Sequence, residues 1–192
     1  MNGDSNNKNR NGNDTGDFSY LKKNIEEIRG RIDNAAARSG RRAGDINVIA
    51  VTKTVEAYII ERVIDLGVGD IGENKVQELC GKYGIIGNRC KWHMIGHLQT
   101  NKVKYIIDKV DLIHSLDRIE LAREIQKRAE KAGKIVKALV QVNISEEESK
   151  SGIPKETTLP FLIELSGFRN LKIKGLMTIA PYAENPEKIR HV

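Results

Sequence analysis

The feature that most constrains the fold is a regular alternation between apolar, β-branched runs and amphipathic helical patterns. The β-branched runs predict strands at residues 47–53, 70–74, 91–97, 111–117, 137–145 and 171–180. The segments between them carry apolar residues at helical spacing, as in residues 55–67, where Gly67 ends the pattern. Continuous apolar strands joined by helical crossovers indicate a parallel sheet covered by helices. Two architectures fit this order: an open doubly wound sheet or a (β/α)8 barrel.

The ends of the chain differ from this alternating body. Residues 1–17 contain no aliphatic residue after Met1 and are rich in Asn, Gly and Asp, so we expect a disordered polar tail. The folded domain is expected over residues 18–192, beginning with an amphipathic helix that ends before Gly40. A length of 192 residues suits one such domain. Near the C-terminus, Asn185-Pro186-Glu187 predicts the start of another helix.

Composition excludes several classes of function. The net charge is +6, but Lys and Arg stand beside Asp and Glu along the helical patterns, and aromatics make up only 5%. This arrangement favours a solvated mixed-charge surface over a nucleic-acid site, so we expect no nucleic-acid partner. No apolar run approaches the ~20 residues that a membrane span needs. Cys80 and Cys90 form no metal or redox motif, so a reducing cytoplasm is the simplest compartment.

Lys53 is the first candidate for chemistry, because it ends an apolar strand. In both architectures ligands gather at the carboxyl ends of the strands. Ile49, Val51 and Lys53 share one strand face, and an inward-pointing face would bring the ammonium to the rim of an apolar interior. Desolvation there would lower the pKa of Lys53, and a neutral amine forms imines with aldehydes and ketones. The alternative is a lysine whose stem lies on apolar surface and whose ammonium reaches solvent.

Three further patterns give weaker evidence for a functional site. His93 and His97 share a strand face, but a zinc site of the H-E-x-x-H kind needs a helix and a glutamate, and neither is predicted here. The run GVGDIG at 67–72 matches G-x-G-x-x-G, but a helix precedes it and a strand follows, which is the wrong context for a dinucleotide loop. Asn74 and Asn143 end strands, where an asparagine either contacts a ligand or satisfies local backbone groups.

Several segments together resemble the pyridoxal phosphate homeostasis protein family of the YggS/PROSC type. The segments are VIAVTKT (48–54), DIGENKVQE (70–78), KWHMIGHLQTNKVKYI (91–106), IHSLDRIELA (113–122), VQVNISEEESKSGI (140–153) and IKGLMTIAP (173–181). They cover the chain from about residue 18 to residue 192, and the run WHMIGHLQTNK is long enough to be highly specific. The resemblance implies an α/β fold: a (β/α)8 TIM-type barrel like the N-terminal domain of alanine racemase.

The resemblance also implies a cofactor and its site. Family members bind pyridoxal 5′-phosphate as an imine on the lysine that ends the first barrel strand, which corresponds here to Lys53. Asn74 and His93 occupy motif positions that face the cofactor, and Met177 in GLMTIA is a further cofactor-binding candidate. Lys150 is the alternative amine. No metal is expected.

Relatives of this type continue for about one helix and two β/α units beyond the position of Val192. The resemblance places the phosphate-binding residues there, in a serine- and glycine-rich turn and an Arg-Ile-Gly segment. We therefore expect the chain as given to be truncated after about six β/α units and to retain its cofactor weakly.

The expected function is a cofactor-binding protein without turnover, which takes part in intracellular vitamin B6 homeostasis. Apo-enzymes that depend on pyridoxal phosphate are the expected recipients, and a monomer is expected. The alternative is an amino-acid racemase-like enzyme that uses the same imine. Those enzymes add a β-rich second domain and a catalytic tyrosine, and no tyrosine of this chain ends a predicted strand.

Overall fold

The fold is described from a computed structural model, for residues 18–144, 151–181 and 183–190. The chain divides into two compact units, one up to Ile46 and one from Asn47 onward. In the first unit, helix α1 (Ser19–Arg38) and the 3₁₀ turn η1 (Ala43–Asp45) are described. The amphipathic helix predicted before Gly40 is therefore present. The predicted disordered tail, residues 1–17, lies outside the described residues.

The second unit is built on a seven-stranded sheet in which every pair of neighbouring strands is parallel. The strands are β1 (Ile49–Val51), β2 (Asp70–Glu73), β3 (Lys91–Met94), β4 (Leu112–Leu116), β5 (Val136–Asn143), β6 (Ile153–Pro154) and β7 (Leu171–Met177). Strands β1 to β6 are neighbours in chain order, and β7 pairs with β5 over most of its length. Each of the six predicted strands overlaps one of these strands. The two-residue strand β6 was not predicted.

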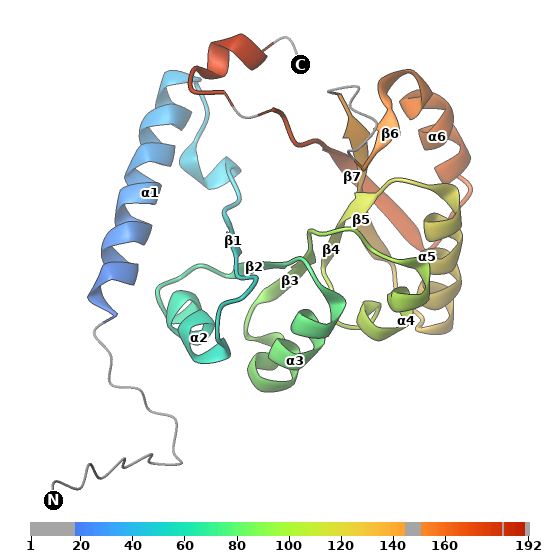
Figure 1. The fold of residues 1–192 in the computed structure, drawn as a ribbon, viewed down its shortest axis with the longest axis horizontal. Helices are drawn as coiled ribbons and strands as arrows, with labels where there is room; N and C mark the ends of the chain where they lie inside the picture. Colours follow the sequence, from blue (N-terminus) through green and yellow to red (C-terminus); the bar gives the residue numbers. More distant parts are fainter. Residues whose placement is uncertain (1–17, 145–150, 182, 191–192) are drawn as a thin grey trace, which may run out of the picture. The chain divides into compact units, whose positions relative to one another are not determined.

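Helices connect the strands and cover one side of the sheet, as Figure 1 shows. They are α2 (Ala57–Asp65), α3 (Val76–Ile86), α4 (Val103–Ile106), α5 (Ile119–Lys131) and α6 (Thr158–Leu165), with 3₁₀ turns η2 (Gly87–Arg89), η3 (Thr100–Lys102), η4 (Lys155–Thr157) and η5 (Pro186–Ile189). Pro154 is of a residue type that commonly begins helices, but here it belongs to β6, whose two residues pair with the end of β5. Asn185 does begin a helical turn, because its side chain accepts a hydrogen bond from the backbone N–H of Glu187.

The main core lies between the sheet and these helices. It contains strand residues such as Ile71 and Ile113 and helix residues such as Ile60, Leu79 and Ile125, all with 0% exposure. Because side chains alternate along a strand, the residues that do not face the helices point to the opposite face of the sheet. That second face carries the candidate site.

The strand order decides between the two predicted architectures. A doubly wound sheet reverses its strand order at a switch point, whereas a (β/α)8 barrel keeps neighbouring strands in chain order. The observed order is that of a barrel, and the sheet curves with its helices outside (Figure 1). Within the described residues β1 and β7 do not pair with each other, so the barrel is not closed. All the strands are parallel, so their carboxyl ends meet at one rim.

Candidate cofactor pocket

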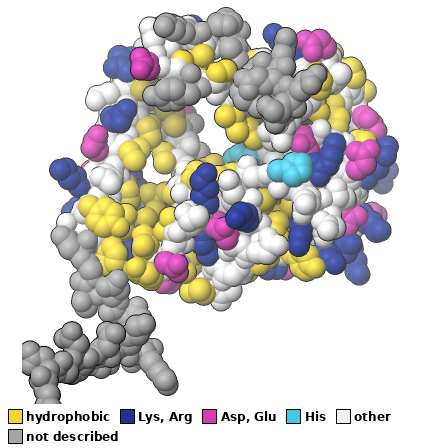
Figure 2. All heavy atoms as spheres, viewed as in Figure 1, with side chains coloured by type: hydrophobic (Ala, Val, Ile, Leu, Met, Phe, Trp, Pro, Cys, Tyr) yellow, Lys and Arg dark blue, Asp and Glu magenta, His cyan; other side chains and the backbone are white. Residues whose placement is uncertain are grey.

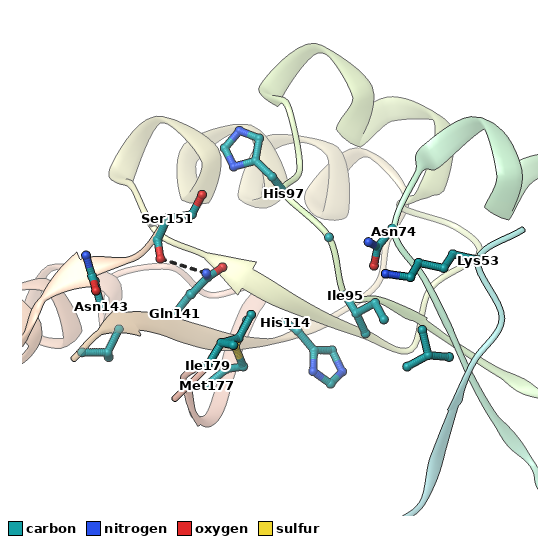
Figure 3. A pocket seen from close by; sticks show the side chains of 13 residues that line it. Lys53, Asn74, Ile95, His97, His114, Gln141, Asn143, Ser151, Met177 and Ile179 are labelled. Atoms are coloured by element: carbon teal, nitrogen blue, oxygen red, sulfur yellow. Dashed lines mark hydrogen bonds between the residues drawn. The ribbon is translucent and has the colours of Figure 1, made fainter. Parts of the chain in front are cut away.

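A pocket of about 620 Å³ lies at the carboxyl ends of the strands. Its apolar lining residues are Val51, Ile95, Val142, Met177 and Ile179, and its polar ones are Lys53, Asn74, His97, His114, Gln141, Asn143 and Ser151, together with Gly96. Figure 3 shows these side chains converging from β1, β4, β5 and β7 and from the residues after β2 and β3. The volume is in the range of small-molecule sites, about 300–1,000 Å³.

Lys53 extends into this pocket from the residue that lies two positions after β1. Val51 and Lys53 both line the pocket, so the strand face predicted from their spacing does point inward. Nζ of Lys53 forms no hydrogen bond or ion pair with any other residue that the structure describes. The expected desolvation of this lysine is not observed, because β1 is an edge strand and both Val51 and Lys53 are exposed.

A buried ion pair holds the backbone immediately before Lys53. Oε1 of Glu73 accepts hydrogen bonds from the hydroxyl of Thr52 (2.5 Å) and from Nζ of Lys82 (2.8 Å). The same Lys82 ammonium also donates to the backbone oxygen of Thr52, at 2.7 Å. Glu73 is fully buried, and the Lys82 side chain is 12% exposed. Strand β2 and helix α3 therefore fix the end of β1 from the side of the sheet opposite to the pocket.

The residue after Lys53 has an unusual backbone conformation. Thr54 has a φ of 63°, in the left-handed region that β-branched residues rarely adopt. Its backbone N–H donates to Oε2 of Glu78 at 3.0 Å, and Glu78 belongs to α3. That hydrogen bond is the main cause of the lowered pKa of the Glu78 carboxyl, and the charges of Lys82 and Lys75 lower this pKa further. A carboxylate on α3 thus anchors the turn that leaves β1, and this turn sets the direction of the lysine.

Asn74 and Gly96 lie side by side where β2 and β3 end. A Cβ atom on Gly96 would lie 2.3 Å from the backbone oxygen of Asn74, closer than two atoms can approach. Glycine at this position therefore lets the two chain segments pack together, and Asn74 reaches the pocket beside Lys53 (Figure 3). Met177, at the end of β7, lines the opposite wall. Lys53, Asn74 and Met177 thus line one pocket, and their contact with a cofactor stays a prediction.

His93 is placed differently from the other three predicted residues. It does not line the pocket; it is buried at 4% exposure behind His114, which does. Nε2 of His93 lies 2.8 Å from Oδ1 of Asp70, and Nδ1 lies 2.9 Å from Nε2 of His114. The expected position of His93 at the pocket surface is therefore not observed, because His114 from β4 lines the pocket in its place. A contact between His93 and the cofactor stays a prediction.

His114 and Gln141 are pocket residues that sequence reasoning did not single out. Both are polar residues within strands, and their neighbours Ile113 and Val140 are fully buried on the other face. This inward-facing polar pattern was the available signal. Gln141 donates from Nε2 to the backbone oxygen of Ser151 at 2.9 Å, which ties β5 to the segment that leads into β6 (Figure 3). The alternative amine, Lys150, lies outside the described residues.

No group of three or more metal-ligating side chains occurs among the described residues. In the same part of the chain, no helix is long and apolar enough to cross a membrane. Figure 2 shows Lys and Arg side chains interspersed with Asp and Glu on the face in view, as the sequence predicted. Cys80 and Cys90 are both free thiols.

Comparison with known families defines the class of domain. The family model for the alanine racemase N-terminal domain matches residues 17–191, almost the whole chain. A solved structure of a protein of unknown function from Bifidobacterium adolescentis superposes with a TM-score of 0.84 at 33% identity, covering 90% of this chain and 74% of that one. The open barrel and its pocket thus define an alanine-racemase-type barrel domain.

Curated relatives narrow this class. The pyridoxal phosphate homeostasis protein of Aquifex aeolicus is 42% identical over 167 residues, which are 86% of this chain and 73% of that protein. PipY of Synechococcus elongatus, solved with pyridoxal phosphate bound, has a TM-score of 0.70 at 28% identity and covers 82% of this chain and 74% of its own. The chain belongs to the pyridoxal phosphate homeostasis protein family.

Proposed function

We propose that this protein binds pyridoxal 5′-phosphate reversibly through Nζ of Lys53 and takes part in vitamin B6 homeostasis. The observation that carries the proposal is the position of this amine, which enters the pocket at the rim of a parallel barrel without a partner among the described residues. The family supports the choice of ligand, since PipY has been solved with pyridoxal phosphate bound. Pyridoxal phosphate supplies an aldehyde, with which an amine forms an imine and releases water.

The residues present fit such a ligand. A flat heteroaromatic ring needs apolar walls and a few placed polar groups. Val51 and Ile95 lie on one side of the pocket, and Met177 and Ile179 lie on the other, as Figure 3 shows for the labelled residues. The amide of Asn74 stands next to Lys53 as a hydrogen-bonding group. Which residues hold the phosphate stays a prediction from the resemblance.

The proposed function is tested by the visible absorption spectrum of the protein with added pyridoxal phosphate. We expect an imine band that disappears in Lys53→Ala, because no other amine lies in the described lining of the pocket. Lys127, an exposed lysine on α5, provides the matched control, and Lys127→Ala should keep the band. Borohydride reduction followed by peptide mapping should place the adduct on Lys53. An adduct on Lys150, or a band that survives in Lys53→Ala, would contradict the proposal.

We further propose that the protein carries its cofactor without turnover, as a cytoplasmic monomer that supplies apo-enzymes. The names of its relatives, which are homeostasis proteins, support this choice over a racemase. An assay for racemisation of common amino acids by the cofactor-loaded protein distinguishes a cofactor carrier from a racemase. Sustained racemisation that is lost in Lys53→Ala would show an enzyme. Transfer to an apo-enzyme, followed by recovery of that enzyme's activity, would support a carrier.

A further inference from the structure

Three adjacent strands each contribute one side chain to a continuous hydrogen-bonded chain on the inner face of the sheet. Asp70 begins β2, His93 lies in β3 and His114 lies in β4. The two links measure 2.8 Å and 2.9 Å. Gly72, which pairs in register with His93, has no side chain of its own, and the side chains of Ile49 and Ile95 pack over it. Only His114 reaches the pocket, so the chain leads from a buried carboxylate to the ligand site.

The charges along this chain determine its hydrogen positions. Burial alone would raise the pKa of Asp70, but hydrogen bonds from Asn47 and His93 and the charge of Lys91 lower it overall. Asp70 is therefore an anion that accepts the hydrogen on Nε2 of His93. A neutral His93 then presents a bare Nδ1, and Nε2 of His114 must donate to it. This assignment leaves Nδ1 of His114 as a free acceptor, without a hydrogen-bond partner among the described residues.

The hydrogen-bonded chain of Asp70, His93 and His114 has a second state, in which it holds one more proton. When Nδ1 of His114 takes up a proton, the proton on its Nε2 can pass to Nδ1 of His93. The positive charge then rests on His93, 2.8 Å from the Asp70 carboxylate, and His114 is neutral again. Burial, together with the neighbouring His93, lowers the pKa of His114 to about 4, so charge is disfavoured on His114 itself. The positive charge is better stabilised on His93, which pairs with the Asp70 carboxylate.

We propose that Asp70, His93 and His114 form a proton relay that serves the condensation of Lys53 with an aldehyde ligand and the reverse reaction. This inference rests on the proposed function. The Lys53 ammonium gives one proton, through water in the pocket, to Nδ1 of His114, and the neutral amine forms the carbon–nitrogen bond. The relay returns that proton to the carbonyl oxygen, and a second proton passes to the same oxygen from the attacking nitrogen. The oxygen then leaves as water, while the nitrogen keeps one hydrogen in the protonated imine. The relay gains no net proton, and release runs through the same steps in reverse.

The ionisable groups that face this relay come from three strands. Lys53 follows β1, Asp70 in β2 belongs to the relay itself, and Lys91, whose charge acts on Asp70, lies in β3 together with His93, with His97 after that strand. The side chains from β5 and β7 in the pocket, Gln141 and Met177, do not ionise. The Nδ1 atom of His97 lies 3.7 Å from Oδ2 of Asp117, away from the relay. Two imidazoles therefore line the pocket: His114 belongs to the relay, whereas His97 pairs with Asp117, and Lys53 is the amine in the described lining.

The test measures rates of imine formation and release by stopped-flow absorbance, with pyridoxal 5′-phosphate and the full chain. In His114→Gln both rates should fall by about 100-fold, the low end of general acid–base effects, while their ratio changes by less than about 3-fold. A relay speeds both directions equally, whereas a purely structural role would shift the equilibrium. Added imidazole should restore both rates in His114→Gly.

Asp70→Asn provides the second arm, because it removes the charge that stabilises a protonated His93. We expect slower rates and a lower pH for the inflection of the rate profile. Asp111→Asn is its matched control, since Asp111 also accepts a hydrogen bond from β3, at the backbone of Trp92, but lies outside the pocket. Wild-type rates in His114→Gln would overturn the relay. Absence of any Lys53 adduct in the wild type would instead overturn the proposed function.

Discussion

The buried pair between Glu73 and Lys82 shows how single residues determine the position of the amine. Oε1 of Glu73 is fully hydrogen-bonded, whereas Oε2 is buried without a partner among the described residues. A carboxylate in this environment depends on its cation. The loss of Lys82 would leave a charge with 0% exposure and would also free the backbone oxygen of Thr52.

We therefore predict that Lys82→Ala lowers the free energy of unfolding by about 3–5 kcal/mol, as expected when one partner of a buried ion pair is removed. Urea denaturation measures the change. Arg123→Ala is a suitable control, because the ion pair between Arg123 and Glu164 joins two largely exposed side chains and should contribute almost nothing. Equal stability of Lys82→Ala and the wild type would show that the buried pair is not structural.

The sequence predicted some site residues and missed others for a physical reason. Lys53, Asn74 and Met177 end strands, and all strand ends of a parallel barrel meet at one rim. His93 and His114 lie inside strands, where the local sequence does not reveal which inward ring covers the other. That order depends on the register between β3 and β4, in which His93 pairs with Leu112 rather than with His114.

Among the secondary-structure elements, the ends of β2 and β3 are the most tightly constrained. Gly96 follows β3 and contacts the backbone of Asn74, which follows β2. The rigid backbone cannot move aside as a flexible side chain would. Any side chain at position 96 therefore separates the two strand ends that carry part of the pocket.

Gly96→Ala should weaken binding of pyridoxal phosphate at least 10-fold, since Asn74 would shift relative to Lys53. Titration of the imine band gives the dissociation constant. The matched control is Gly81→Ala in α3, where a Cβ atom meets nothing within 4 Å. That change should stabilise the fold by about 0.5–1 kcal/mol and leave the binding unchanged. Unaltered binding by Gly96→Ala would mean that the strand ends tolerate separation.

Strands were predicted better than their connections. The strand at 137–145 overlaps β5 (Val136–Asn143) closely, because Ala138, Val140 and Val142 alternate along the strand and are buried on one face, which gives a strong period-two signal. The two residues of β6 gave no such signal. Asp117 followed by Glu120 is a pattern typical of a helix cap, but Asp117 pairs with Arg118 and His97 instead, and these tertiary contacts are invisible in the local pattern.

For the whole molecule, acid stability should reflect the buried imidazole. The pKa of His114 falls from 6.5 to about 4 because of burial and the nearby His93. Between these values the unfolded chain binds a proton at this residue and the folded chain does not, so the free energy of unfolding falls as the pH falls. The pKa of Asp70 is lowered from its usual 3.8 in the folded protein. Asp70 therefore also makes the free energy of unfolding fall as the pH falls, but only below about pH 3.8.

The corresponding prediction is that His114→Gln loses less stability than the wild type between pH 7 and about pH 4.5. Urea denaturation at the two pH values checks it, with each protein compared with itself. An identical loss in both proteins would assign the acid sensitivity to other groups. Since stability is measured on the protein without added cofactor, the result does not depend on the proposed function.

The alternating pattern of strands and helices predicted two possible architectures, and the barrel was one of them. Strand order, which requires knowledge of long-range pairing, separated them. Local sequence specifies each strand and helix, but the order in a parallel sheet depends on how crossovers pack, which residues distant in the chain decide together.

The hydrogen bond from Lys82 to the backbone of Thr52 has a practical consequence for protein engineering. Because helix α3 holds the backbone next to Lys53 from outside the barrel, its residues offer a way to tune the rates of the proposed binding and release of pyridoxal phosphate. Libraries confined to that helix would leave every side chain in the described lining of the pocket intact. Sensors with graded exchange times are the expected product.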